Sequence, residues 1–311
     1  MSTTTQPAST AVEQFARRQR TPLQRVQHLL HSHPAISPFL VLVVAFAAFS
    51  VINPRFASPN SLSLVVQQVA VVGALAVGQT LIILTAGIDL SVGAITILAM
   101  MLAAKLAEGA GLPGVAAIGV GVLVGTAAGL VNGLLVTRLK LPPFIVTLGT
   151  LSIFTAIGLL YSRGRSVQSV DLPGILNWTG ESFAVGRFRI TYGVVLVAVL
   201  YLVVGFALAN TAWGRHVYAV GDDREASRLA GIRVDRVLVS VYTAAGAIYG
   251  LTAWSHSGGG GVDSASASTD AKLESITAVV TGTSTALPVG SVTRTVGGVV
   301  SGGAAVVKLH A

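Results

Sequence analysis

The residues that could do chemistry in this chain are few and scattered. Its 311 residues include only 12 carboxylates and 6 histidines, and there is no cysteine. A catalytic site needs positioned acids, bases, nucleophiles or metal ligands, and the common ATP-binding loop G-x-x-x-x-G-K-[ST] does not occur in the sequence. His28, His31 and His33 form a small cluster, which we interpret as solvated because it lies in a basic tail. We therefore expect no catalytic residue, no metal and no cofactor.

Charge is concentrated in one segment, residues 211–237, between two apolar runs. The segment contains five arginines and four carboxylates: Arg215, Arg224, Arg228, Arg233, Arg236, Asp222, Asp223, Glu225 and Asp235. Within it, the stretch Glu225–Ile232 predicts a short amphipathic helix that ends at Gly231. We expect this segment to be cytoplasmic and to bind a partner.

The elements that must position these residues are membrane helices. The chain is 52% hydrophobic and 10% charged, whereas a soluble domain has about 25% charged residues. An all-α, polytopic helical membrane protein with eight to nine transmembrane helices is expected. The apolar runs cover residues 36–52, 62–86, 92–107, 115–136, 144–161, 190–208, 237–254 and 276–287, with a weak ninth at 296–307.

The positive charges predict the orientation of these spans. Residues 1–35 are interpreted as a cytoplasmic N-terminal tail, residues 36–308 as the membrane domain, and residues 211–236 as a cytoplasmic loop. Inside loops then hold about eleven Lys and Arg residues, against five or six outside. Topology therefore explains the net charge of +8 without a nucleic-acid partner. The outside loop 162–189 is expected to be a connector, a short interfacial helix or a hairpin.

Polar residues among the apolar runs have two readings each. Asp89 is a carboxylate between two long runs, so it is either the N-cap of the third span or a pathway or gating residue. Gln79 and Thr147 could line a path for a hydroxyl-rich solute, or bond one helix to another.

Glycines recur at a spacing of four along the fourth span. Small residues at this spacing let a second helix approach closely, where van der Waals contact drives association in lipid. We therefore interpret these glycines, Gly121, Gly125, Gly129 and Gly133, as a helix-packing face.

Three motifs together resemble a known family. Glu225, Ala226, Ser227 and Gly231 match the E-A-A-x-x-x-G coupling loop of ABC importer permeases, with Ser227 in place of the second alanine. With GQTLIILTAGIDLSVGA (78–94) and LKLPPFIVTLGTLSIFTAIGLLYSRGRSV (139–167), the chain resembles permeases of the ribose/xylose/galactoside class of bacterial carbohydrate importers.

The resemblance implies a transporter subunit in the bacterial cytoplasmic membrane, with several partners. These are a second permease copy, a twin-cassette ATP-binding protein, an extracytoplasmic sugar-binding protein and membrane lipid. The residues of the E-A-A motif would couple ATP hydrolysis in the partner chain to the membrane spans.

The C-terminal region departs from this family pattern. From residue 286 onward the sequence ALPVGSVTRTVGGVVSGGAAVVKLHA has few bulky apolar residues, where the family continues into further helices. A truncation or frameshift near residue 285 is our hypothesis for residues 286–311, and it would leave transport competence open.

Two other functions remain as alternatives. A branched-chain amino acid ABC permease has similar hydropathy and also carries a charged cytoplasmic loop. A secondary transporter that works without an ATPase is the other alternative, although it would be expected to place more ionisable groups at the membrane midplane.

Overall fold

The computed structural model of the chain describes residues 36–163, 167 and 171–257. The tail 1–35 with its histidines, the expected spans 276–287 and 296–307, and the atypical segment 286–311 lie outside the described residues. The chain divides into two compact units, residues 1–48 and 49–311. Helix α3 (Ile36–Ile52) has 17 residues and no charged side chain. Its residues 36–48 are the described part of the first unit, and its last four residues belong to the second unit.

Six long helices make up most of the described part of the second unit, and each is long and apolar enough to cross a membrane. They are α4 (Pro59–Leu84), α5 (Val92–Ala110), α6 (Gly114–Arg138), α7 (Pro143–Ser162), α9 (Tyr192–Asn210) and α12 (Val234–Ser257). With α3, all seven apolar runs predicted between residues 36 and 254 are helices, with ends displaced by a few residues. The total of eight to nine remains a prediction.

Shorter elements connect the long helices. They are α8 (Gly174–Asn177), the 3-10 turn η2 (Trp178–Gly180), strands β1 (Ser182–Val185) and β2 (Phe188–Thr191), α10 (Ala212–Asp222) and α11 (Arg224–Leu229). The strands form an antiparallel hairpin in which Val185 pairs with Phe188, and Gly186 in the turn has φ +61°. The loop 162–189 therefore contains both a short helix and a hairpin.

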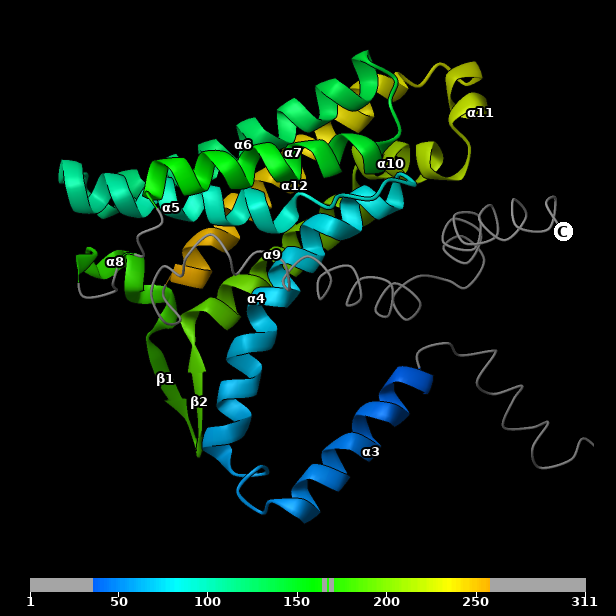
Figure 1. The fold of residues 1–311 in the computed structure, drawn as a ribbon. Helices are drawn as coiled ribbons and strands as arrows, with labels where there is room; N and C mark the ends of the chain where they lie inside the picture. Colours follow the sequence, from blue (N-terminus) through cyan, green and yellow to red (C-terminus); the bar gives the residue numbers. More distant parts are fainter. Residues whose placement is uncertain (1–35, 164–166, 168–170, 258–311) are drawn as a thin grey trace, which may run out of the picture. The chain divides into compact units, whose positions relative to one another are not determined.

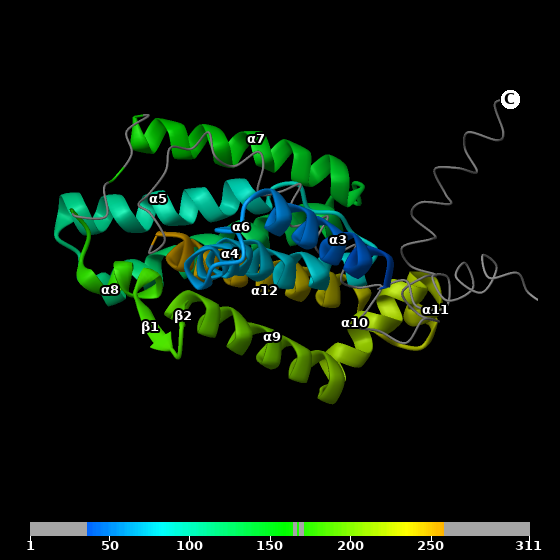
Figure 2. The same ribbon diagram turned by 90° about the horizontal axis from the view of Figure 1, so that it is seen from below.

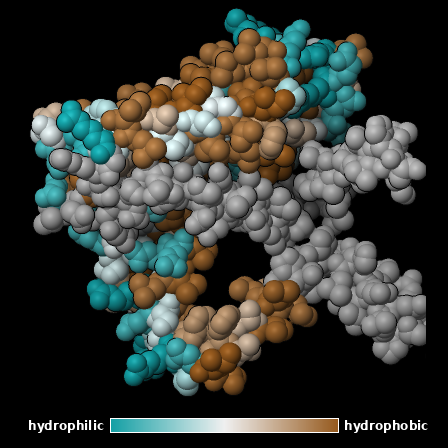
Figure 3. Space-filling model, in the orientation of Figure 1, coloured by the Kyte–Doolittle hydropathy of each residue, from teal (hydrophilic) through white to brown (hydrophobic). Residues whose placement is uncertain are grey.

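The described connections gather at two ends of the helix bundle (Figure 1). We name the end formed by residues 85–91, 139–142 and 211–233 the charged end, and the end formed by residues 111–113 and 171–191 the hairpin end. α10 and α11 lie at the charged end, and α8 lies at the opposite end. In the space-filling view, the apolar surface of α6 and α7 lies between hydrophilic patches at the two ends (Figure 3). This pattern is typical of helices that cross a bilayer.

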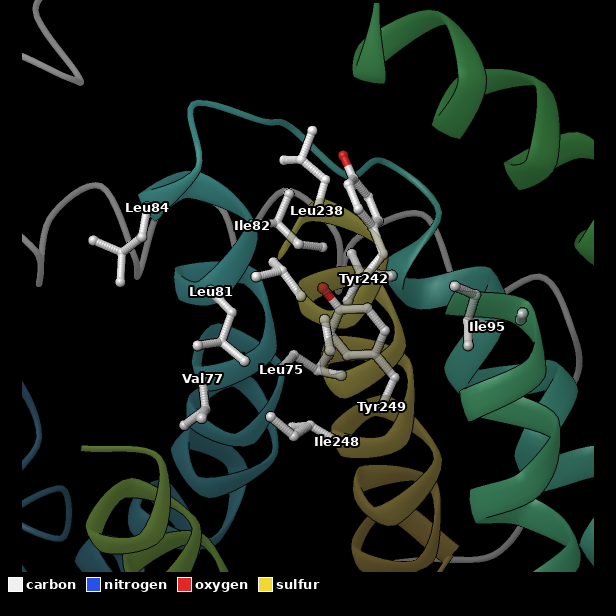
Figure 4. Close-up of a cluster of buried hydrophobic side chains, with 14 of the residues drawn as sticks. Leu75, Val77, Leu81, Ile82, Leu84, Ile95, Leu238, Tyr242, Ile248 and Tyr249 are labelled. Atoms are coloured by element: carbon white, nitrogen blue, oxygen red, sulfur yellow. The ribbon is translucent and has the colours of Figure 1, made fainter. Parts of the chain in front are cut away.

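Helix α12 lies in the middle of the second unit, with α9 on one side and α5 and α7 on the other (Figure 2). It packs against α4, α5 and α6. The core between α4 and α12 contains fully buried residues of both helices, including Leu75, Leu81, Ile82, Tyr242 and Tyr249 (Figure 4). Helix α12 therefore connects this core directly to the charged end, where it begins at Val234.

Candidate functional site

The segment that the sequence singles out as a docking loop folds as two short helices at the charged end. Asp223 is the N-cap of α11, and its carboxylate accepts hydrogen bonds from the backbone N–H groups of Glu225 (2.8 Å) and Ala226 (3.0 Å). The helix ends in a Schellman motif, in which Gly231 N–H donates to the Arg228 carbonyl and Ile232 N–H to the Ser227 carbonyl, both at 3.0 Å. Gly231 has φ +83°, which favours glycine. The predicted short helix ending at Gly231 is confirmed.

Helix α11 presents one face outward and one inward. Glu225, Ala226 and Leu229 are exposed, and the exposed fraction of Leu229 is 84%. Ser227 is buried, so the one departure from the E-A-A pattern falls on the inward face. The Arg228 guanidinium lies 3.6 Å from Glu225 and 3.7 Å from Asp235. Exposed ion pairs of this kind contribute only about 0–1 kcal/mol, so α11 holds its shape mainly through its caps.

Three contacts attach α10 and α11 to the helix bundle. The Trp213 indole N–H donates to Ser240 Oγ on α12 at 2.8 Å. Gly221, near the end of α10, lies directly against the Leu84 carbonyl at the end of α4, so that a side chain at this position would overlap backbone. The Arg224 guanidinium donates to the Thr85 carbonyl at 2.9 Å. The outward face of α11 is therefore supported by two membrane helices.

Asp89 lies in the α4–α5 connection and is 1% exposed. Its Oδ1 accepts from Ser91 N–H (2.7 Å) and from the Ser91 hydroxyl (2.6 Å), and Asn132 Nδ2 on α6 donates to the same hydroxyl at 2.8 Å. The N-cap of α5 is Ser91, so the expectation that Asp89 holds that position is wrong. Burial raises the pKa of the Asp89 carboxyl to about 6, and the two bonds from Ser91 lower the pKa by less.

Thr147 and Gln79 also bond one element to another. Thr147 Oγ1 on α7 accepts from Leu90 N–H at 3.1 Å and lies 3.2 Å from the Ile88 carbonyl. Gln79 Oε1 on α4 accepts from the Tyr249 hydroxyl of α12 at 3.2 Å, and both side chains are fully buried. The structure thus brings Asp89 and Thr147 to the same connection and places Gln79 deeper, between α4 and α12. These contacts agree with the interpretation that Gln79 and Thr147 bond one helix to another.

The glycine series of α6 faces α12 along most of its length. A Cβ at Gly125 would lie 2.7 Å from Gly250 N and closer still to the Gly246 carbonyl, and one at Gly129 would overlap the Tyr242 carbonyl. At Gly133 the nearest atom would be Val239 Cα at 3.0 Å, whereas Gly121 has ordinary contacts from 3.6 Å. Gly246 and Gly250 of α12 therefore complement Gly125, and the two backbones meet without side chains between them.

Sequence reasoning missed several residues of this site. Leu229 is one apolar residue among many in the sequence, and only its exposure distinguishes it. Asp223 could have been recognised as a cap, because an aspartate directly before a predicted helix is a known start signal. The bond from Arg224 to Thr85 joins residues 139 positions apart, and no local pattern indicates it.

Comparison with known proteins gives a consistent result. Residues 61–309 match the family described as branched-chain amino acid transport system / permease component. The chain is 46% identical to the fructose import permease protein FrcC of Rhizobium meliloti over 88% of this chain and 78% of that protein. It is 35% identical to the ribose import permease protein RbsC of Bacillus subtilis, over 70% of this chain and 66% of the relative.

A third relative is the D-allose transport system permease protein AlsC of Escherichia coli, 35% identical over 68% of this chain and 64% of that protein. The chain thus spans slightly less than two thirds of the ribose and allose permeases. No solved structure matches the chain.

Proposed function

Since the chain belongs to the family described as branched-chain amino acid transport system permease components, and its relatives are import permeases for sugars, we propose that it is the membrane subunit of an ATP-driven monosaccharide importer. It is a transporter subunit rather than an enzyme, and ATP is hydrolysed in a partner chain. The partner would be a protein with two ATP-binding cassettes. An extracytoplasmic sugar-binding protein and a second permease copy would complete the assembly.

The observation that carries this proposal is the exposed face of α11. A leucine that is 84% exposed, beside Glu225 and Ala226 on a capped and anchored helix, is an apolar anchor surrounded by charge. Burial of an exposed apolar side chain against a partner stabilises the complex. In this proposal the ATPase binds α11, with Glu225, Ala226, Ser227 and Gly231 forming and shaping the coupling helix.

Sugar is favoured over amino acid as the cargo. The family description names branched-chain amino acids, but the relatives matching this chain over 68–88% of its length are named for fructose, ribose, allose and autoinducer 2. In this proposal Asp89, Gln79 and Thr147 act in gating rather than in contact with the sugar, because all three are buried and bonded to neighbouring elements.

The proposed location is the bacterial inner membrane, with the charged end in the cytoplasm. Among the described residues of the second unit, the charged end and the adjoining helix ends carry seven Lys or Arg residues: Arg138, Lys140, Arg215, Arg224, Arg228, Arg233 and Arg236. The opposite side carries five: Arg55, Lys105, Arg163, Arg187 and Arg189. Positive residues favour the cytoplasmic side. Six apolar runs precede α10, and because this number is even, the N-terminus then lies inside as well.

A pull-down of the tagged chain from detergent-solubilised membranes tests the docking role. The matched variants are Leu229→Asp and Val185→Asp, since Val185 is also exposed (49%) but lies at the hairpin end. Burying a leucine is worth about 1.5–3 kcal/mol, so Leu229→Asp should weaken ATPase retention by about tenfold or more. Val185→Asp should retain the ATPase as the unmodified chain does.

The retained protein is identified by mass spectrometry and by its ATP hydrolysis. An unmodified, folded chain that retains no twin-cassette ATPase would contradict the proposed function. Uptake of radiolabelled fructose, ribose and leucine by cells expressing the full system then identifies the cargo class. Uptake of leucine alone would instead support the amino acid permease.

A further inference from the structure

The carboxyl end of α4 depends on a residue of the coupling segment. We propose that Arg224 is a positioning residue that transmits movement of α11 to the α4–α5 connection, residues 85–91. This inference rests on the proposed function, because it assumes that α11 is where the ATPase acts. It assigns the transmitting role to a residue outside the E-A-A motif.

The end of α4 has a backbone carbonyl, that of Thr85, which accepts a hydrogen bond from Arg224. The helix ends in a Schellman motif, in which Gly87 N–H donates to the Ile82 carbonyl (3.0 Å) and Ala86 N–H to the Ile83 carbonyl (2.9 Å). Thr85 is fully buried, and a buried carbonyl without a partner destabilises the structure around it. The Arg224 guanidinium donates to this carbonyl at 2.9 Å, and its positive charge also favours the negative end of the helix dipole.

Arg224 is the first residue of α11 and directly follows the cap Asp223. On the other side of the cap, Gly221 of α10 lies against the Leu84 carbonyl. The corner between α10 and α11 therefore contacts two successive carbonyl groups at the end of α4. A displacement of α11 must move the end of α4 or break these contacts.

The α4–α5 connection distributes such a movement to other spans. Leu90 N–H is bonded to Thr147 on α7, and Asp89 is linked through Ser91 to Asn132 on α6. The Tyr242 hydroxyl of α12 points toward the connection (Figure 4) and would lie 3.1 Å from a Cβ at Gly87. Three further helices thus contact a connection of seven residues whose start is held by Arg224.

Two buried polar atoms at this connection are available for hydrogen bonds in a second arrangement. Within the described residues, neither Asn132 Oδ1 nor the Tyr242 hydroxyl has a hydrogen-bond partner. Because buried polar groups are almost always paired, a shift of the connection that paired them would be stabilised. Arg224 is placed to control that shift.

Arg228 provides the matched control. It lies on the same helix, its side chain is 54% exposed, and its two ion pairs stay within the segment 225–235. The variants are therefore Arg224→Gln, Arg228→Gln and the conservative Arg224→Lys, which keeps the positive charge near Thr85.

The first measurement is hydrogen–deuterium exchange on the full, detergent-solubilised chain without any partner. Arg224→Gln should speed exchange of the amides in residues 85–91 by tenfold or more, while Arg228→Gln leaves them unchanged. Unchanged exchange in Arg224→Gln would overturn the inference, whether or not an ATPase partner exists.

The second measurement uses proteoliposomes containing the chain, the ATPase that co-purifies with it and the sugar-binding protein, with radiolabelled fructose and ribose as probes. Arg224→Gln should retain the ATPase and its hydrolysis but lower sugar uptake per ATP at least tenfold, with partial recovery in Arg224→Lys. Coupling within twofold of the unmodified chain, or loss of ATPase binding in Arg224→Gln, would overturn the transmitting role. Failure of the unmodified chain to bind an ATPase would contradict the proposed function instead.

Discussion

Replacing Gly125 by alanine tests whether backbone contact between α6 and α12 holds the bundle together. The new Cβ would lie 2.7 Å from Gly250 N and 2.9 Å from Gly250 Cα, and closer to the Gly246 carbonyl. All three are backbone atoms, so no rotamer change relieves the overlap and the helices must separate. Overpacking typically costs about 1–3 kcal/mol, and we expect the upper end, about 3 kcal/mol, because a whole helix must move.

A gain in helix propensity opposes this loss. Alanine is about 1 kcal/mol better than glycine in a helix interior, so the net destabilisation from Gly125→Ala should be about 2 kcal/mol. Gly119→Ala is the matched control, because Gly119 is exposed on the same helix and a Cβ there meets nothing within 4 Å. That variant should be stabilised by about 0.5–1 kcal/mol.

The assay is thermal unfolding in one detergent, followed by tryptophan fluorescence. The two variants should differ by about 3 kcal/mol, which corresponds to a Tm difference of roughly 5 °C for a chain of this size. Gly121→Ala should resemble the control, since its contacts begin at 3.6 Å. Equal Tm values for Gly125→Ala and Gly119→Ala would refute the reasoning, because the helices would then not be in backbone contact.

Two further predictions concern the charged end. The pKa of Asp89 is raised to about 6 from 3.8, so the folded state binds a proton more tightly than the unfolded state. Protonation of Asp89 therefore stabilises the fold by up to about 3 kcal/mol. This contribution is complete below about pH 3.8 and is lost as the pH rises through 6. Tm measured at pH 5 and pH 8 should therefore fall with pH in the unmodified chain, and a similar fall in Asp89→Asn would show that another group is responsible. Asp223→Ala removes both cap bonds of α11 and should cost about 1 kcal/mol locally; faster amide exchange at Glu225 and Ala226 would be the sign, and unchanged exchange would exclude Asp223 as the cap.

The long helices could be predicted from the sequence because a bilayer imposes the same requirement on each. A run of about 20 apolar residues satisfies that requirement alone, so the ends of α5 and α7 fall close to their predicted limits. The spacing of four glycines likewise places them on one helix face. It does not distinguish Gly121 from Gly125, because the difference depends on where Gly250 lies across the interface.

The site was predicted less completely, because several of its contacts join residues that are distant in the sequence. The helix ending at Gly231 follows from local residues, whereas the support beneath it comes from Thr85 and Ser240, which are distant in the sequence. The sequence allows Asp89 two roles, and the N-cap of α5 is one of them because Asp89 precedes the apolar run. Ser91 holds that position, and Asp89 instead accepts the Ser91 N–H and hydroxyl.

The Schellman motifs that end α4 and α11 differ in the residue that takes the left-handed conformation. This difference affects the equilibrium between arrangements of the α4–α5 connection. Helix α11 ends with Gly231 in the left-handed region, but α4 ends with Ala86 at φ +54°. A left-handed conformation costs an L-residue about 1 kcal/mol, which corresponds to a factor of about five in an equilibrium constant. Any alternative arrangement in which Ala86 leaves the left-handed region is favoured by that factor. A partner therefore needs to supply less free energy to move the end of α4.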